Sequence, residues 1–278
     1  MDYIEDLYPG KKLVGLGKGK FAVVSCFLRN EDNQPVALKI PTHHTDNLQN
    51  EREILLLLHK QSNYICQIII DDDFMRKNIL VMNVYAGGAL NKHIQLSSRT
   101  GMHISIAIGY AVQLVSALHA LGRIKIIHRD IKTSNCVLDQ HGHIKLCDFG
   151  SAKLLGQVKS NSNGSSSHPT TQSDFHKNLS HIKNRTFTIT GTAHIMSPEM
   201  VAATVGYDAS VDYWALGAVL YEILRGRIPP WNRNVTQISE GKSRASECVD
   251  NREVSWPDKI AEGIARHALT HSYTHSGT

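Results

Sequence analysis

Cysteine is scarce in this chain, and the cysteines are not arranged in pairs. Five occur among 278 residues, an odd number, and no two of them form a CxxC pair. A disulfide-bonded small domain and a structural zinc site both need paired or clustered cysteines. The sequence therefore argues against both frameworks and predicts reduced thiols.

The chain also lacks a long apolar run. The longest apolar stretches, such as residues 54–58 and 68–70, are far shorter than the roughly 20 residues of a membrane-spanning helix. The N-terminus carries the acids Asp2, Glu5 and Asp6, where a secretory signal would carry basic residues and then an apolar segment. We expect no membrane span and a cytoplasmic protein, with the nucleus as an alternative location.

Positive charge is modest and unevenly spread. The formal net charge is +5, and residues 151–190 hold five Lys or Arg side chains against a single acid, Asp174. Nucleic-acid binding favours basic and aromatic side chains interleaved on an ordered face, whereas this segment is rich in Ser, Asn, Thr and Gly. We therefore predict no nucleic-acid partner. We also predict that residues 156–180 are a disordered insert, because they cannot bury enough apolar surface to become ordered.

The first part of the chain has the pattern of a small sheet with one helix. Residues 11–40 alternate as three strands broken by turns, and residues 45–59 carry apolar side chains at helical spacing after the cap candidates Thr45 and Asp46. Two further strand-like pieces cover residues 65–70 and 78–84. We expect residues 1–82 to form a mostly β lobe.

The second part of the chain has a helical pattern. Residues 104–121 and 211–224 are the two clearest helices, and a short strand pair, residues 136–138 and 144–147, lies between them. The first of these helices has a predicted apolar face of Ile108, Val112, Val115 and Leu118. We expect residues 83–278 to form a hinge and a larger, mainly helical lobe, so the predicted fold class is α+β.

Small residues in the first lobe fit a phosphate-binding turn. Gly17, Gly19 and Ala22 lie between the first two predicted strands, where backbone N–H groups can close over phosphates without a side-chain clash. An ordinary hairpin that contains glycine has the same pattern. This motif alone therefore leaves the two interpretations open.

Lys39 lies on an apolar strand about twenty positions further on. It is either an edge residue that favours solubility or a phosphate ligand. An acidic partner decides between these roles, and Glu51 is the expected partner because it lies on the inner face of the predicted helix. Glu53 is the alternative, although it points about 200° around the helix from Glu51.

The strongest chemical signal is the pair of motifs HRDIKTSN at residues 128–135 and DFG at residues 148–150. Phosphoryl transfer needs an acid to orient and deprotonate the acceptor hydroxyl, and oxygen ligands that hold Mg²⁺ against the phosphates. Asp130 is the candidate base, and Asn135 and Asp148 are the candidate metal ligands. Lys132, two residues after the base, can reach the migrating phosphate.

With these motifs in order, the chain resembles the eukaryotic protein kinases over nearly its whole length. Lys132 and Thr192 resemble the serine/threonine class, in which Thr192 would position the peptide and Asp212 would anchor the catalytic loop. The resemblance implies a bilobal kinase fold, ATP and Mg²⁺ as cofactors, and protein substrates. It also implies an ATP site lined by Gly17, Gly19, Ala22, Val24, Ala37, Lys39, Met82, Asn83 and Tyr85, with the backbone of Asn83 and Tyr85 bonded to adenine.

Within the protein kinases, RTFTITGT at residues 185–192 and VDYWALGAVLYEIL at residues 211–224 resemble the AGC group. Other pieces, such as DFGSAKLL and GTAHIMSPEM, look most like the 3-phosphoinositide-dependent protein kinases, which activate other AGC kinases. This finer resemblance implies activation loops of other AGC kinases as substrates. The chain stops near the point where the family has an arginine paired with the equivalent of Glu199, so we consider a truncated second lobe.

Arg129 and Thr188 suggest regulation. Arg129 beside Asp130 would be an unpaired cation unless an anion met it, and a phosphate on the activation segment is the natural partner. Thr188, four residues before Thr192, is the candidate phosphorylation site. A pseudokinase that uses the fold as a nucleotide-binding scaffold is the alternative function, although the presence of Lys39, Asp130 and Asp148 argues against it.

Overall fold

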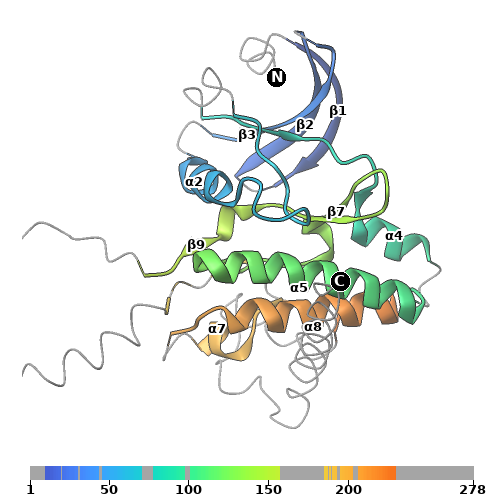
Figure 1. The fold of residues 1–278 in the computed structure, drawn as a ribbon, viewed down its shortest axis with the longest axis vertical. Coiled ribbons are helices and arrows are strands. Elements are labelled where there is room, and N and C mark those ends of the chain that lie inside the picture. Colours follow the sequence, from blue (N-terminus) through green and yellow to red (C-terminus); the bar gives the residue numbers. More distant parts are fainter. Residues whose placement is uncertain are drawn as a thin grey trace, which may run out of the picture.

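The computed structural model describes residues 10–19, 21–30, 32–43, 46–70, 78–97, 101–156, 185–186, 188, 190–192, 195–202 and 206–229. Figure 1 shows a lobe of β-strands above a helical lobe. The predicted α+β, two-lobed fold is therefore confirmed. The predicted insert from residue 157 onwards and the chain end beyond residue 229 lie outside the described residues.

The sheet of the first lobe consists of four antiparallel strands in chain order: β1 (Gly10–Lys18), β2 (Ala22–Arg29), β3 (Pro35–Pro41) and β4 (Leu80–Asn83). One face packs into a core of its own made by Phe27, Val36, Leu38, Ile40, Ile79 and Val81. Because side chains alternate along a strand, Ala37 and Lys39 lie on the other face. The register sets Val24 opposite Lys39 and Ala37 opposite Met82, so these four candidate ATP-binding residues share that second face.

The helix of this lobe, α2 (Gln49–Leu58), begins later than its predicted start at residue 45. Asp46 accepts a hydrogen bond from the backbone N–H of His43, and the side chain of Asn78 accepts one from the N–H of Leu48 at 3.0 Å. These bonds hold the chain before Gln49 in a turn. The predicted capping by Asp46 is therefore wrong, because its carboxylate closes the preceding turn instead.

The predicted strand at residues 65–70 is also not a regular strand. Ile65 forms a single parallel bridge with Leu146, and Ile68 forms a single antiparallel bridge with Met82. The segment thus pairs first with the second lobe and then with the sheet of the first lobe. This change of partner prevents a continuous ladder, although the apolar run has the composition of a strand.

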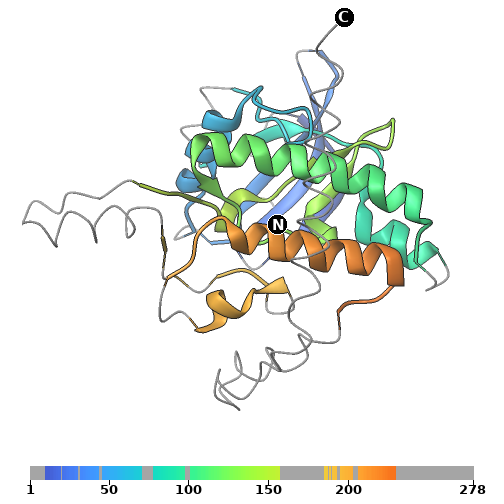
Figure 2. The ribbon, with the colours of Figure 1, turned by 60° about the horizontal axis from the view of Figure 1, so that its bottom comes forward.

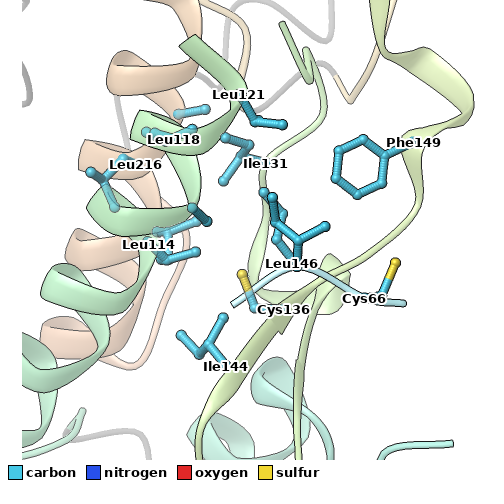
Figure 3. Packing of buried hydrophobic residues seen from close by; sticks show 14 of the residues in the cluster. Cys66, Leu114, Leu118, Leu121, Ile131, Cys136, Ile144, Leu146, Phe149 and Leu216 are labelled. Atoms are coloured by element: carbon cyan, nitrogen blue, oxygen red, sulfur yellow. The ribbon is translucent and has the colours of Figure 1, made fainter. Parts of the chain in front are cut away.

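The second lobe is built on two long helices that lie side by side, α5 (Ile104–Ile124) and α8 (Ser210–Arg225), as Figures 1 and 2 show in green and orange. Shorter elements complete the described part: β5 (Gly88–Ala89), α4 (Leu90–Leu96) and α7 (Pro198–Ala202). In Figure 3, Leu114 and Leu118 of α5 lie between Leu216 of α8 and Ile131. The predicted helices at residues 104–121 and 211–224 are confirmed.

The buried face of α5 differs from the predicted one. Ile108 is 47% exposed and Val112 is 43% exposed, whereas Val115 and Leu118 are buried as predicted. The buried face instead follows Ala107, Ala111, Leu114, Leu118 and Leu121. Small alanines allow a neighbouring element to approach closely, so the face that packs is not the one with the most β-branched side chains.

Among the described residues, α5 is the one helix long and apolar enough to pass for a membrane span. Its inner face belongs to the largest core cluster, and it contacts α2, α8 and β8 (Ile144–Leu146). The central helix of a protein core can have the same length and composition as a membrane-spanning helix. The length and composition of α5 are therefore only weak evidence for membrane insertion.

Short strands and 3₁₀ turns lie between the two lobes and carry the predicted catalytic motifs. The strands are β6 (Ile126–Ile127), β7 (Cys136–Leu138), β8 and β9 (Lys153–Leu154), and the turns are η1 (Thr133–Asn135) and η2 (Phe149–Ser151). The strand β7 pairs with β5 and β8, and β6 pairs with β9. Cys136, Ile144 and Leu146 anchor the β7–β8 hairpin in the core facing α5 (Figure 3).

Candidate active site

Three charged side chains from separate elements meet at the candidate phosphate site. Lys39 Nζ on β3 donates to both carboxylate oxygens of Glu51 on α2, at 2.8 and 2.7 Å, and to Asp148 Oδ1 at 2.7 Å. The Glu51 side chain is 3% exposed, whereas that of Asp148 is 46% exposed. Glu53 is exposed and bonds to Gln49 Nε2 on its own helix. The predicted pairing of Lys39 with Glu51 is confirmed, and the alternative with Glu53 is wrong.

The electrostatics of this cluster favour a charged lysine. Burial disfavours the cation, but the nearby Glu51 and Asp148 carboxylates outweigh it and raise the pKa of Lys39. Burial raises the pKa of the Glu51 carboxyl, and the adjacent cation opposes this effect. For Asp148, burial is again opposed by Lys39, and the net effect lowers its pKa. One cation thus holds two carboxylates together in a partly desolvated environment.

The local backbone around Asp148 is held by hydrogen bonding and by packing. Asp148 itself has a left-handed φ of 63°, which turns the chain sharply after β8. The N–H of Phe149 donates to Glu51 Oε1 at 3.2 Å, and a Cβ on Gly150 would lie 3.4 Å from carboxylate oxygens of both Glu51 and Asp148. Phe149 is fully buried against His128, with ring centroids 4.7 Å apart. Packing and the Glu51 bond therefore fix the backbone that presents Asp148.

The candidate catalytic base, Asp130, is held by a second network. Lys132 Nζ donates to Asp130 Oδ2 at 2.8 Å and to Thr192 Oγ1 at 2.6 Å, and Thr192 Oγ1 donates to Asp130 Oδ1 at 2.6 Å. Asn135 Nδ2 donates to the Asp130 backbone carbonyl at 2.9 Å. The structure thus brings together four of the predicted residues, although Thr192 is 62 positions from Asp130 in the chain.

A close backbone approach brings Thr192 to the catalytic loop. Gly191 has a φ of 99°, and a Cβ at this position would lie 2.4 Å from the carbonyl oxygen of Arg129. Only glycine can occupy this position without moving the loop. The sequence motif therefore has a steric reason that becomes visible only in the folded chain.

The buried Asp212 of α8 holds the catalytic loop from below. Its carboxylate accepts hydrogen bonds from the backbone N–H groups of His128 at 2.7 Å and Arg129 at 2.8 Å. Burial raises the pKa of Asp212, and these two bonds together with His128 oppose that shift. The anchoring role that the resemblance implied for Asp212 has the geometry that it requires.

Arg129 has partners of a different kind. Its Nε donates to the backbone carbonyl of Ser151 at 2.6 Å, and its Nη1 donates to the hydroxyl of Tyr207 at 3.3 Å. No carboxylate forms an ion pair with its guanidinium within the described part of the chain. Its side chain is thus hydrogen-bonded, but to neutral oxygen atoms. Thr188 is exposed, and its backbone carbonyl accepts a bond from the Tyr207 hydroxyl.

Tyr207 is a site residue that the sequence motifs do not identify. It lies before α8, outside the HRD and DFG motifs, and a single tyrosine after a glycine carries no chemical signal. Only the fold brings it against Arg129 and the Thr188 backbone.

The predicted adenine region lies at the end of β4. Met82 and Tyr85 are half-buried, and the Asn83 backbone N–H donates to the Gln67 carbonyl at 3.1 Å. The Tyr85 hydroxyl accepts from the Gln67 N–H at 2.9 Å, and burial raises its pKa. The N–H of Asn83 is therefore occupied, which leaves its carbonyl and the Tyr85 backbone as the candidate adenine contacts.

The glycine-containing turn lies across the sheet from Lys39. Gly17 pairs with Val24, and Val24 pairs with Lys39, so the three positions form one row across β1, β2 and β3. Gly17 is exposed, and a Cβ there would meet no other atom within 4 Å. The Gly19 N–H donates to the carbonyl of Ala22 at 2.8 Å, which closes the turn. The row places Gly17 and Lys39 at the same level of the sheet, on strands that β2 separates.

Asn135 and Asp148 fit a divalent cation by their chemistry. Asn135 Nδ2 faces the carbonyl and carboxylate of Asp130, so its amide oxygen is the end turned away from that acid. The Cys147 N–H donates to the Asn135 carbonyl at 2.8 Å, which holds the residue before Asp148 beside Asn135. A carboxylate and an amide oxygen are ligands that Mg²⁺ accepts.

This geometry defines the class of the protein. Residues 11–267 match the protein kinase domain family, and the chain belongs to it. A Caenorhabditis elegans protein named cAMP-dependent protein kinase, catalytic subunit-like, is 28% identical over 233 residues, 81% of this chain and 50% of that protein. Serine/threonine protein kinase ypkA of Aspergillus fumigatus is 30% identical over 230 residues, covering 80% of this chain and 32% of that protein.

Protein kinase C-like 1 of Caenorhabditis elegans is 29% identical over 263 residues, 90% of this chain and 32% of that protein. These relatives are of the AGC type, so the predicted group is confirmed. The chain spans about half the length, or less, of the curated relatives it matches.

Proposed function

We propose that this chain is an ATP-dependent serine/threonine protein kinase that transfers the γ-phosphoryl group of ATP to Ser or Thr hydroxyls of protein substrates. The observation that carries this proposal is the presence of two side-chain networks, on segments that the hydrogen bond from the Cys147 N–H to the Asn135 carbonyl joins. One is the Lys39, Glu51 and Asp148 ion cluster, and the other is the Asp130, Lys132 and Thr192 hydrogen-bond network. The first suits phosphate and metal, and the second suits an acceptor hydroxyl.

In this proposal Asp130 orients the acceptor hydroxyl and takes its proton. Both of its carboxylate oxygens already accept hydrogen bonds, from Thr192 and from Lys132, so the carboxylate is held in one orientation. Lys132 balances the negative charge that develops on the migrating phosphoryl group. Thr192 links the activation segment to the base and would position the peptide.

Lys39 would bind the ATP phosphates, and Glu51 would fix its orientation. Asn135 and Asp148 would hold Mg²⁺, which supplies neutralisation of phosphate charge when it is bound. The adenine and ribose would lie against the sheet face and the end of β4, in a site lined by Gly17, Gly19, Ala22, Val24, Ala37, Met82, Asn83 and Tyr85. The common face of Val24, Ala37 and Lys39 supports this placement.

A nucleotide-binding scaffold without phosphoryl transfer is less well supported. A pseudokinase would be expected to have lost one of the groups that handle phosphate or metal. Here Lys39 retains both carboxylate partners and Asp130 retains its network.

We further propose that the substrates are activation loops of other AGC kinases. The support is the resemblance of DFGSAKLL and GTAHIMSPEM to 3-phosphoinositide-dependent protein kinase 1. The group of relatives agrees with this proposal at the coarser level of AGC-type kinases.

Thr188 is the proposed regulatory phosphorylation site. Its exposure leaves the hydroxyl accessible, and the Arg129 guanidinium on the catalytic loop has neutral oxygen partners in the described structure. A phosphate at Thr188 would give this cation an anionic partner. Full activity of the Thr188→Ala variant would contradict this role.

The test of the function is transfer of radiolabelled phosphate from ATP to a generic protein and to an AGC activation-loop peptide. We expect transfer by the wild-type chain and its loss in both Asp130→Asn and Asp148→Asn. In a thermal-shift measurement, Mg-ATP should still raise the melting temperature of Asp130→Asn, because Asp130 does not belong to the proposed nucleotide site. A folded, Thr188-phosphorylated wild type that binds Mg-ATP without transfer would support the scaffold instead. A preference for the loop peptide would support the narrower substrate class.

A further inference from the structure

A buried tyrosine outside the kinase motifs joins the activation segment to the catalytic loop. Tyr207 is 2% exposed and packs in a small core cluster with Ile127, Leu155, Met200 and Val211. A buried phenol hydroxyl needs hydrogen-bond partners, because an unsatisfied polar group in an apolar environment costs free energy. The partners that Tyr207 has are the reason to assign it a role beyond packing.

The hydroxyl of Tyr207 both donates and accepts a hydrogen bond. It donates to the backbone carbonyl of Thr188, and it accepts from Arg129 Nη1 at 3.3 Å. A hydroxyl has one donor and two acceptor lone pairs, so one oxygen can satisfy both bonds. The same side chain therefore contacts the activation segment and the residue that precedes the catalytic base.

The backbone of Tyr207 holds the activation segment as well. Its N–H donates to the Thr186 carbonyl at 2.9 Å, and its carbonyl accepts from the Thr186 N–H at 2.8 Å. Lys153 Nζ of β9 donates to Thr186 Oγ1 at 2.9 Å, which adds a side-chain contact to this residue. Thr186 is thus held by the backbone of Tyr207, and Thr188 is held by the Tyr207 hydroxyl.

The contact with Arg129 matters because the backbone of Arg129 is strained and lies next to Asp130. Its φ of 69° lies in the left-handed region, which non-glycine residues adopt only when surrounding bonds hold them. The bonds that hold it are the Asp212 carboxylate at its N–H and the Ser151 carbonyl at its Nε. The Tyr207 hydroxyl completes the set of described side-chain contacts, and Asp130 follows one residue later.

We propose that Tyr207 is a positioning residue, whose hydroxyl sets the activation segment at Thr188 against Arg129 and so orients the catalytic loop. This inference rests on the proposed kinase function. Tyr207 has no described contact with Lys39, Glu51 or Asp148, so its effect falls on the acceptor side of the reaction and not on ATP binding. The hydroxyl provides this link without phosphate, whereas phosphorylation of Thr188 would add a second one.

Tyr207→Phe tests this role, because phenylalanine keeps the ring in its core cluster and removes only the hydroxyl. In the full chain, with Thr188 phosphorylation measured by mass spectrometry and matched between samples, we expect kcat to fall about tenfold. The KM for ATP and the melting-temperature shift caused by Mg-ATP should not change. Tyr110→Phe, at a half-buried tyrosine of α5 packed against the largest core cluster, is the matched control and should leave kcat unchanged.

A second variant separates positioning from packing. If the hydroxyl acts through Arg129, Tyr207→Phe should cost less in an Arg129→Lys background than in the wild type, because the shared bond is already altered. Equal losses in both backgrounds, or a Tyr207→Phe enzyme with kcat within twofold of wild type, would overturn the proposal.

The outcome remains informative if the wild type transfers no phosphate. That result contradicts the proposed function, and amide hydrogen exchange then tests the contact itself. Tyr207→Phe should speed exchange at residues 186 and 188 relative to Tyr110→Phe. Unchanged exchange at these residues would overturn the positioning role independently of activity.

Discussion

Lys39 and Arg129 are two cations that hold the same short stretch of chain, and their partners differ. Lys39 binds the side chain of Asp148 and is surrounded by two carboxylates. Arg129 binds the backbone of Ser151, three residues further on, and its side chain contacts neutral oxygen atoms only. A cation with ionic partners in place is already organised. A cation with neutral partners can still gain from an anion that arrives later. The comparison separates a fixed part of the site from a part suited to regulation.

The most severe test of this comparison removes the paired cation. Lys39→Met should lower phosphoryl transfer by about 100- to 1000-fold, because the preorganised charge on the phosphates is lost. It should also lower the free energy of unfolding by about 3–5 kcal/mol, because Glu51 is left buried without its cation. Denaturant unfolding and the phosphate-transfer assay measure the two effects.

Two control variants complete this test. Adding Glu51→Gln to Lys39→Met should restore most of the stability and none of the activity, because the buried charge is removed. Glu53→Gln, on the exposed side of the same helix, should change neither quantity. A Lys39→Met protein as stable as wild type would show that the ion cluster contributes no more than its neutral counterpart.

A smaller loss of phosphoryl transfer is expected when Arg129, the cation with neutral partners, is replaced. Arg129→Gln should reduce transfer by Thr188-phosphorylated protein about tenfold, because charge-assisted bonds to phosphate are lost. The free energy of unfolding should change by no more than about 1 kcal/mol, since no buried carboxylate loses its partner. If Arg129→Gln destabilises the protein as strongly as Lys39→Met, the proposed difference between a cation with carboxylate partners and one with neutral partners is wrong.

The third effect, on stability alone, concerns Asp139, a carboxylate that has both charged and neutral partners. Burial would raise its pKa, but the N–H groups of His143 and His141 and the Lys145 ammonium outweigh burial and lower its pKa to about 2. A lowered folded-state pKa stabilises the fold above the ordinary value of 3.8, and this stabilisation is lost as the pH falls from 3.8 toward 2. Asp139→Asn should therefore cost about 1–2 kcal/mol near neutral pH.

Denaturant titrations at a series of acidic pH values check this prediction. The difference in unfolding free energy between wild type and Asp139→Asn should shrink as the pH approaches 2. A difference that is independent of pH would mean that the Asp139 bonds do not depend on its charge.

Helical periodicity was sufficient to pair Lys39 with Glu51 in preference to Glu53, because a rotation of about 200° separates the two acids on one helix. The same kind of pattern was wrong for Ile108 and Val112, which are exposed on α5. Hydrophobic spacing identifies a helix, but the face that packs depends on which neighbour can approach. The helix α5 packs against α8, α2 and β8, and its buried face includes the alanines Ala107 and Ala111.

The sequence by itself determined the family, the order of the motifs, and the residue types that phosphoryl transfer needs at residues 39, 51, 130, 135 and 148. These follow from local spacing and from side-chain chemistry. Only the tertiary structure decided that Arg129 has neutral partners and that Tyr207 joins it to Thr188, 19 positions away in the chain. Such contacts depend on backbone carbonyls and on buried surroundings. Neither has a signature in residue type, because every residue carries the same carbonyl and burial is a property of the folded chain.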